Sequence, residues 1–458
     1  MLGRRDEARD LAASVLKHDP LHFMARAEAL FLAEGSDAAA KARGELEEIL
    51  RGEAQSFLEA ACDYARFGLY RAAFDLLSLC PAPGPMVHYH LGCYAEKLGM
   101  PDAACHFDRG RDADPHYVFP HRIESEHVLR RVIERSPDDG KASYYLGNLL
   151  CARDRTEEAI TCRERALRGQ PGFSVLHRNL GRVYWKTHGD PERSIAEYRK
   201  ALECSPNDYK LYLELDRILQ SCGREADRRH LMEAVPPTLR SNDVVAERMV
   251  ACLVDAGEFC RALEILAKTW FFPWEIYKGV RYLYVDAVIG RGIQLARKGS
   301  DSEAIVGFRQ AMSYPRNIGV GESRWKTNAE AWYRIGLAQQ HAADAPAAKD
   351  SWTRAAEEPR PGADALCCYR AMALRRLGRE AESEAALEAL RGAAQGCLEE
   401  KRGGDAAENH YLAGLAWKGK GDAARARSCF SNALAANPSH RRSRWEQDGF
   451  TAEGAAGT

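Results

Sequence analysis

Residues 140–171 read GKASYYLGNLLCARDRTEEAITCRERALRGQP, and the spacing within this stretch decides the fold. The pair Leu146-Gly147 is followed three residues later by Leu150, and Ala159 comes twelve residues after the glycine. Small residues at these two places let two antiparallel helices approach closely, while larger apolar residues fill the space between them. Pro171 ends the second helix, because proline lacks a backbone N–H and clashes with the preceding turn. The stretch therefore predicts one helix–turn–helix unit.

The same spacing recurs along most of the chain with a period of about 34 residues. Its eighth and twentieth positions are small, as in Gly147 and Ala159 and again in Gly336 and Ala348. Alternating β-branched runs are nearly absent, whereas Ala, Leu, Glu and Arg, which favour helices, dominate. Such pairs bury their apolar faces only by stacking on their neighbours, which produces a concave inner face. We therefore expect an all-α fold, a right-handed superhelix of about 9–11 repeats.

This pattern resembles the tetratricopeptide repeat. The resemblance divides the chain into five parts. They are divergent repeats over residues 1–138, central repeats over 139–269, an aromatic insertion over 270–284, C-terminal repeats over 285–440 and a flexible tail over 441–458. The first part is expected to begin in mid-repeat, at the turn and second helix of a unit.

A second resemblance rests on four segments, residues 117–122, 144–150, 272–275 and 314–321. In this order they are similar to the C-terminal repeat region of a family of large bacterial proteins. In that family a β-rich domain of unknown function precedes the repeats. The resemblance implies a bacterial protein with a β-rich domain as a partner in cis or in trans. Residues 276–279 depart from the family, which usually continues there with a glycine-rich acidic stretch.

Composition excludes several classes of function. The 458-residue chain has 45% hydrophobic residues and a net charge of -1, which argues against a general nucleic-acid binder. The sequence contains no run of about 18 apolar residues, so no membrane span is expected, and no signal peptide is recognised. The 14 cysteines are scattered without a Cys-x-x-Cys motif, as expected of free thiols in a reducing compartment. We therefore expect a cytoplasmic protein.

The first candidate site is the concave face of the central repeats. The second, fifth, ninth, twelfth and thirteenth positions of each first helix are expected to face this groove. The candidate peptide-binding residues at these positions are Lys141, Tyr144, Asn148, Arg178, Arg182 and Lys210. Asn179 is a further candidate, because it falls on an offset at which some tetratricopeptide domains carry a peptide-binding asparagine.

Some tetratricopeptide domains hold the C-terminal carboxylate of a peptide with Lys, Asn, Asn, Lys and Arg at fixed offsets. Here these offsets fall on Tyr144, Asn148, Asn179, Lys210 and Glu214, so three of five match. Glu214 replaces a cation and would repel a carboxylate. The alternatives are a different ligand on this face, or ordinary repeat sequence without a ligand.

The second candidate is the aromatic insertion, with Trp270, Phe272, Trp274, Glu275 and Tyr277 as residues that would contact a ligand or a partner domain. Insertions in repeat arrays often bind, and exposed rings can stack on a sugar or a protein. The alternative is that these rings fill the core where the repeat is interrupted.

Histidines and cysteines between His88 and His127 are read as packing or surface residues, because His88 and His90 point to different sides of a helix. The segment Gly319-Val320-Gly321 is too short for a nucleotide loop. No motif supplies a nucleophile with its base, so we expect no enzyme, no cofactor and no metal. The sequence predicts a non-catalytic scaffold that binds a protein or peptide partner, and neither nucleic acid nor a membrane. The alternative is the accessory half of a carbohydrate-related enzyme.

Overall fold

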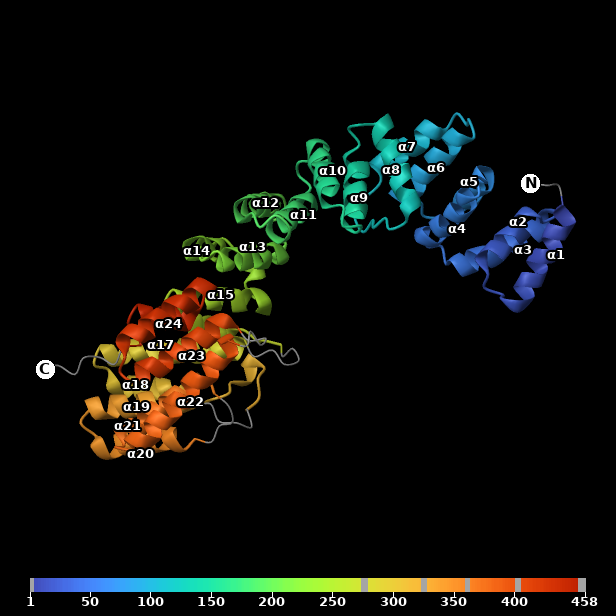
Figure 1. Ribbon diagram of the computed structural model, residues 1–458. Coiled ribbons are helices and arrows are strands. Elements are labelled where there is room, and N and C mark those ends of the chain that lie inside the picture. The colour runs from blue at the N-terminus through green and yellow to red at the C-terminus, as the bar shows by residue number, and fades with distance from the viewer. Residues whose placement is uncertain (1–3, 273–278, 323–327, 359–362, 400–404, 452–458) are drawn as a thin grey trace. The chain divides into compact units, whose positions relative to one another are not determined.

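The computed structural model describes residues 4–272, 279–322, 328–358, 363–399 and 405–451 (Figure 1). These residues form 25 α-helices and two 3-10 helices, and none of them lies in a strand. The predicted all-α helical repeat fold is confirmed. The chain divides into two compact units, Met1–His188 and Gly189–Thr458, and each is described by itself.

The described residues of the first unit form eleven helices. They are α1 (Arg5–His18), α2 (Phe23–Phe31), α3 (Ser36–Leu50), α4 (Ala54–Arg66), α5 (Tyr70–Leu77), α6 (Pro85–Lys97), α7 (Ala103–Asp112), α8 (Ile123–Arg135), α9 (Gly140–Cys151), α10 (Thr156–Gly169) and α11 (Ser174–Lys186). Consecutive helices such as α4 and α5, α6 and α7, and α9 and α10 form the antiparallel pairs. Helix α8 stands between two pairs without a second helix of its own.

The second unit holds the remaining helices among the described residues. They are α12 (Pro191–Cys204), α13 (Tyr209–Ser221), α14 (Glu225–Glu233), η1 (Pro237–Leu239), α15 (Asp243–Asp255), α16 (Phe259–Lys268), α17 (Gly279–Arg297), α18 (Asp301–Gln310), η2 (Arg316–Ile318), α19 (Ala329–His341), α20 (Ala345–Glu357), α21 (Ala365–Arg376), α22 (Glu380–Glu399), α23 (Ala406–Gly419), α24 (Ala423–Ala436) and α25 (Arg441–Gln447).

Glycines at the eighth repeat position set the distance between the two helices of a pair. A Cβ added at Gly92 would lie 2.7 Å from the Phe107 ring, and one at Gly414 would lie 2.5 Å from the Phe430 ring. Each ring comes from the second helix of the same pair. The aromatic residue therefore fills the space that glycine leaves, as the repeat spacing predicts.

The core of the first unit continues from one pair to the next. Tyr64, Tyr89 and Tyr145 are each at most 1% exposed and lie on α4, α6 and α9. The Tyr89 hydroxyl donates to the Asp139 carboxylate at 2.7 Å, and that carboxylate also caps α9 by accepting from the Ala142 N–H at 2.9 Å. A buried hydrogen bond thus ties the start of one pair to the preceding one.

The predicted insertion over residues 270–284 is shorter in the structure, because α17 already begins at Gly279. Val280, Leu283 and Ala287 follow helical spacing and are buried, so these residues continue a helix rather than a loop. Before the helix, Phe271 is 2% exposed and its N–H donates to the Asn317 carbonyl at 2.8 Å.

The predicted flexible tail is also wrong over its first residues. Arg441–Gln447 form helix α25, and Trp445 is buried. Its arginines bond to carboxylates of earlier helices, which gives this polar segment a fixed place. Residues 452–458 of the predicted tail lie outside the described residues.

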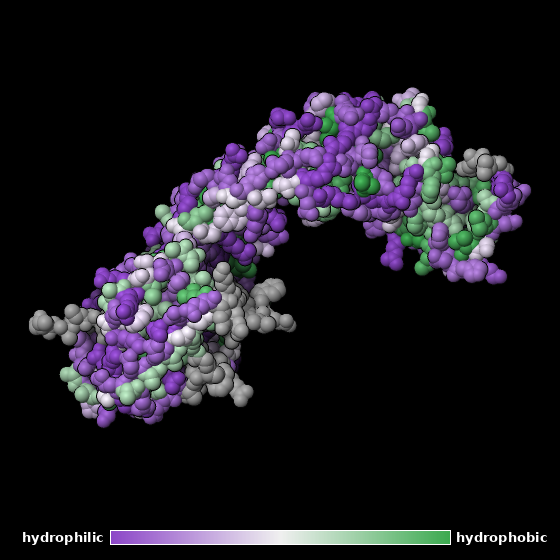
Figure 2. Space-filling model, viewed as in Figure 1, coloured by the Kyte–Doolittle hydropathy of each residue, from purple (hydrophilic) through white to green (hydrophobic). Residues whose placement is uncertain are grey.

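Most of the visible surface is hydrophilic, and apolar atoms gather over the N-terminal helices of the first unit (Figure 2). Leu11 and Leu21 are exposed there. Among the described helices, none combines the length and the apolar character that a membrane crossing requires.

Candidate functional site

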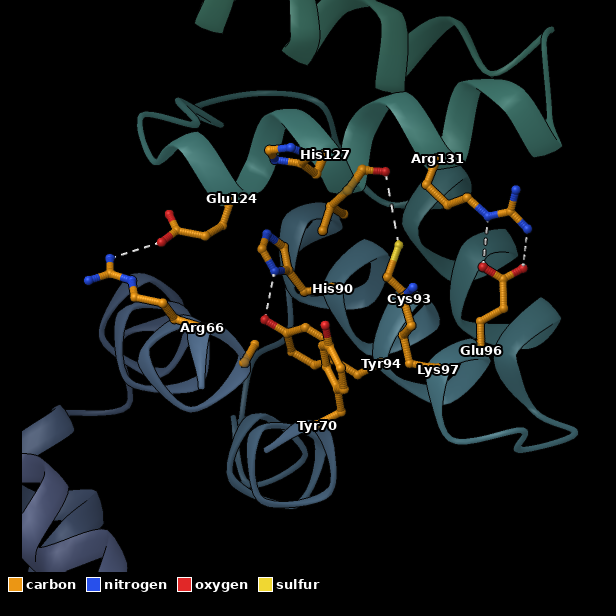
Figure 3. Close-up of a pocket in the computed structure, with 12 residues that line it drawn as sticks. Arg66, Tyr70, His90, Cys93, Tyr94, Glu96, Lys97, Glu124, His127 and Arg131 are labelled. Atoms are coloured by element: carbon orange, nitrogen blue, oxygen red, sulfur yellow. Dashed lines mark hydrogen bonds and ion pairs between the residues drawn. The ribbon is translucent and has the colours of Figure 1, made fainter. Parts of the chain in front are cut away.

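A cleft of about 610 Å³ opens between α4, α5, α6 and α8 of the first unit (Figure 3). Its lining residues are Ala65, Arg66, Tyr70, His90, Cys93, Tyr94, Glu96, Lys97, Glu124, His127, Val128 and Arg131. This volume lies within the range of about 300–1,000 Å³ that ligand pockets occupy.

The cleft lies on the side of the repeats that the sequence predicts to be the groove. With Gly92 at the eighth position of α6, Cys93, Glu96 and Lys97 occupy its ninth, twelfth and thirteenth positions. With Ala61 at the eighth position of α4, Arg66 occupies the thirteenth. Residues at groove positions therefore form one side of the cleft, and α8 forms the other.

Helix α8 is held in place by Arg122, the residue just before it. The Arg122 guanidinium donates to Asp63 at 3.1 Å and to Glu124 at 3.1 Å, and it also pairs with Glu59. Glu59 and Asp63 belong to α4, so these bonds join α8 to α4. Apolar residues of α8, including Val128 and Leu129, are buried on the same side.

An ion pair stands at each end of the cleft. Arg66 pairs with Glu124 at 2.9 Å, and Arg131 donates to both oxygens of Glu96 at 2.9 and 3.0 Å (Figure 3). Hydrogen bonding from Arg122 lowers the pKa of Glu124 to about 2. Hydrogen bonding from Arg131 likewise lowers the pKa of Glu96. Both carboxylates are therefore ionised at neutral pH and already bound to arginine.

The floor of the cleft is uncharged. His90 is fully buried, with Nδ1 3.1 Å from the Tyr94 hydroxyl and Nε2 3.3 Å from the Ser125 hydroxyl. Burial lowers the pKa of His90 to about 4 and raises the pKa of Cys93 to about 12. Cys93 is therefore a thiol at neutral pH, and its Sγ donates to the Val128 carbonyl. A neutral histidine beside a protonated thiol offers packing surface rather than an activated nucleophile.

Some groups of the cleft remain available to a ligand. Tyr70 is half-buried, and its ring lies 6.1 Å from that of Tyr94. Lys97 and His127 are exposed, and Lys97 has no ion-pair partner in the part of the chain that the structure describes. The cleft thus combines an aromatic and aliphatic floor with one available cation at its rim.

The histidines and cysteines singled out in the sequence separate into several places. His90, Cys93 and His127 line the cleft, whereas the rings of His88 and His106 lie 6.1 Å apart on α6 and α7. Over the described ranges, no three His, Cys, Asp or Glu side chains are arranged to hold a metal ion.

The predicted groove residues on α9 make contacts within the protein. Lys141 donates to the Ala113 carbonyl. Tyr144 is 5% exposed, and its ring meets that of Phe173 edge-on at 5.1 Å. The Asn148 side-chain oxygen accepts from Arg163 at 3.4 Å.

The other predicted groove residues lie on α11 and α13. Arg178 and Asn179 are half-buried and Arg182 is exposed, all on α11. Lys210 is exposed on α13 of the second unit, and Glu214 accepts from the Tyr198 hydroxyl at 2.9 Å. A role for these residues in peptide binding stays a prediction.

Trp270 and Phe272 of the aromatic insertion are 58% and 66% exposed. Trp274, Glu275 and Tyr277 lie outside the described residues. Ligand binding by this segment also stays a prediction.

The sequence did not identify the cleft itself. Tyr70, Tyr94 and Val128 have no motif in common: the Tyr70 ring of α5 lies near that of Tyr94 on α6, and Val128 joins them because α8 packs beside α6. The available signal was a single helical pattern over residues 122–135, closed by Pro137, between two complete units, since a helix without a partner interrupts regular stacking.

Comparisons with known proteins agree with the repeat fold. The family model of the tetratricopeptide repeat matches residues 124–172 and 152–209. A comparison with curated proteins finds no match.

Several solved structures are similar to parts of the chain. A tetratricopeptide repeat protein from Parabacteroides merdae ATCC 43184 is 12% identical, over 62% of this chain and 98% of that one, with a TM-score of 0.27. TTC0263 from Thermus thermophilus is 19% identical, over 44% of this chain and all (100%) of that one, with a TM-score of 0.25. YrrB, a tetratricopeptide protein with an unusual peptide-binding site, is 18% identical, over 45% of this chain and 97% of that one, with a TM-score of 0.22. The described part of the chain is an all-α helical repeat protein, and its residues 124–209 match the family model of the tetratricopeptide repeat.

Proposed function

We propose that this chain is a non-catalytic scaffold that binds a peptide segment of a partner protein, and that the cleft between α4, α5, α6 and α8 receives that segment. The observation that carries the proposal is the composition of the cleft. Its carboxylates are bound to arginines and its thiol is protonated, while the half-buried Tyr70 ring and the exposed Lys97 remain accessible.

The lining indicates what kind of peptide fits. Tyr70, Tyr94 and Val128 form a surface for an apolar side chain, such as an aromatic or a leucine. Lys97 at the rim favours a carboxylate close to that anchor. We therefore expect a segment that carries an apolar residue beside an acidic one.

The proposal is tested by selecting peptides from a phage-displayed library on the full chain and measuring their Kd by fluorescence anisotropy. Tyr70→Ala removes part of the floor, and Lys97→Glu reverses the cation at the rim. Each is expected to weaken binding at least tenfold, which corresponds to about 1.4 kcal/mol. Lys17→Glu is the matched control, because Lys17 is an exposed lysine of α1 and does not line the cleft.

Two results would contradict this site. Selected peptides whose Kd is the same for both cleft variants and the wild type do not bind in the cleft. A loss of affinity in Arg178→Glu with Arg182→Glu, without a loss in the cleft variants, would place the site on α11, on the face predicted from the sequence.

A further inference from the structure

The last described helix, α25, packs across the first helices of several repeats of the second unit. Arg441 donates to Asp286 of α17 at 2.9 Å and also pairs with Asp255 of α15. Arg442 donates to Asp286 at 2.6 Å and to Glu330 of α19 at 3.0 Å. Three separate repeats therefore contribute carboxylates to two adjacent arginines.

These carboxylates stand at groove positions of the repeat. With Gly292 and Gly336 at the eighth positions of α17 and α19, Asp286 and Glu330 occupy the second positions. Asp255, two residues before the turn glycine of its repeat, occupies the thirteenth. Positions two and thirteen of the first helix are among those that are expected to face the groove. Helix α25 therefore lies where a bound peptide is expected.

Helix α23 contacts the same segment from another groove position. With Gly414 at the eighth position, Lys418 is at the twelfth, and it donates to Glu446 of α25 at 2.7 Å. Tyr411, at the fifth position, places its ring 5.1 Å from that of His440. The contacts of α25 therefore extend from α15 to α23.

An aromatic anchor accompanies the charges. Trp445 is 6% exposed, and its ring lies edge-on to Phe259 at 5.7 Å and 5.2 Å from Phe450. Burial would raise the pKa of Glu330, but Arg442 and Arg334 hold it at about 2, so this carboxylate is ionised at neutral pH. The groove thus presents fixed negative charge beside the buried Phe259 ring.

We propose that the groove of the second unit is a recognition site for an arginine-rich helix with the pattern Arg-Arg-x-Arg-Trp, and that α25 is its tethered occupant. A partner helix with the same chemistry competes with α25 for Asp255, Asp286 and Glu330. Exchange requires the release of the short helix α25, joined to α24 by residues 437–440, and of Phe450 and Thr451 behind it, while the paired helices stay folded. The site differs from the cleft of the first unit in location and in charge, so either proposal can fail alone.

The test uses the full chain with Arg441→Glu and Arg442→Glu, which places like charges opposite the groove carboxylates and releases α25. The probe is a fluorescein-labelled peptide with the sequence of residues 437–451, NPSHRRSRWEQDGFT. We expect this peptide to bind the released chain at least tenfold more tightly than the wild type, in which α25 competes. The control peptide carries glutamate in place of the first two arginines and is expected not to bind.

Circular dichroism and size-exclusion chromatography show whether the released chain is folded. A folded chain that binds the peptide no better than the wild type does, or that binds the control peptide equally well, overturns the proposal. If the double charge reversal does not fold, Trp445→Ala weakens the same helix without adding charge. Saturating peptide is then expected to raise the Tm of Trp445→Ala, and an unchanged Tm overturns the proposal.

Discussion

In several repeats, glycine at the eighth position of the first helix lets an aromatic ring of the second helix lie against its backbone. Gly336 packs in this way against Trp352, whose indole N–H donates to the Tyr333 carbonyl at 3.3 Å. This feature was predictable from the sequence, because Gly336 and Ala348 repeat the spacing of Gly147 and Ala159.

Replacing Gly336 with alanine is expected to destabilise the second unit by about 1–2 kcal/mol. Overpacking typically costs about 1–3 kcal/mol, and the higher helix propensity of alanine offsets up to about 1 kcal/mol. Urea unfolding followed by tryptophan fluorescence measures the change. Gly396→Ala on α22 is the control, because no heavy atom lies within 4 Å of its added Cβ, and it is expected to be neutral or stabilising. A Gly336→Ala chain as stable as the wild type would contradict the packing described here.

His90 gives the first unit a dependence on pH. Its pKa is about 4 in the folded protein, against 6.5 when it is unperturbed. Below pH 6.5 the His90 ring is protonated in the unfolded chain, whereas the buried ring of the folded chain stays neutral down to about pH 4. The stability from His90 is therefore complete above about pH 6.5 and is lost as the pH falls toward 4.

Lowering the pH from 7 to 5 is expected to decrease the free energy of unfolding by about 2 kcal/mol through the protonation of His90. Hydrogen exchange of the α6 amides, corrected for the intrinsic rate, reports the local free energy of opening at both pH values. His90→Gln keeps a polar side chain that does not titrate. Its free energy of opening is therefore expected to be the same at both pH values. The same decrease in wild type and His90→Gln would assign the effect to another group.

At the scale of elements, helix α8 depends on one side chain that precedes it. Arg122 is bonded to Glu59 and Asp63 of α4 and to Glu124 of α8 itself. Arg122→Ala is therefore expected to raise the hydrogen-exchange rate of α8 several-fold and to weaken a peptide bound in the cleft. Arg130→Ala, which removes an exposed arginine of α8 bonded to Glu126 and Glu158, is the control. Equal exchange in both variants would show that apolar packing alone positions α8.

The sequence predicted the paired helices but not how the two irregular elements pack. Helix α8 has no partner helix in its own repeat, and the residues that hold it, Glu59 and Arg66 among them, are distant in sequence and share no motif with it. Helix α25 was expected to be a flexible tail, since RRSRWEQ is polar and lacks a continuous apolar face. Helix α25 is stabilised by carboxylates on other helices. The helix propensity of residues 441–447 takes no account of these distant charges, so it does not predict their effect. Trp445 and Phe450 were the only local signal of burial.

At the scale of the whole molecule, one principle accounts for both proposed sites. A stack of helix pairs buries the faces that meet and leaves the groove positions to contact something else. In the second unit those positions contact α25, and in the first unit those of α4 and α6 line the cleft. The repeat period therefore predicted which positions face the groove, whereas the contacts of these positions with α8 and α25 depended on elements outside the period.

The most direct test of a groove that binds a peptide is hydrogen exchange of the full chain with and without a peptide selected on it. The account predicts slower exchange in α6 and α8 on binding, with smaller changes in α4 and α5. Protection confined to α9–α11 or to the second unit, or no protection at a saturating peptide concentration, would contradict it.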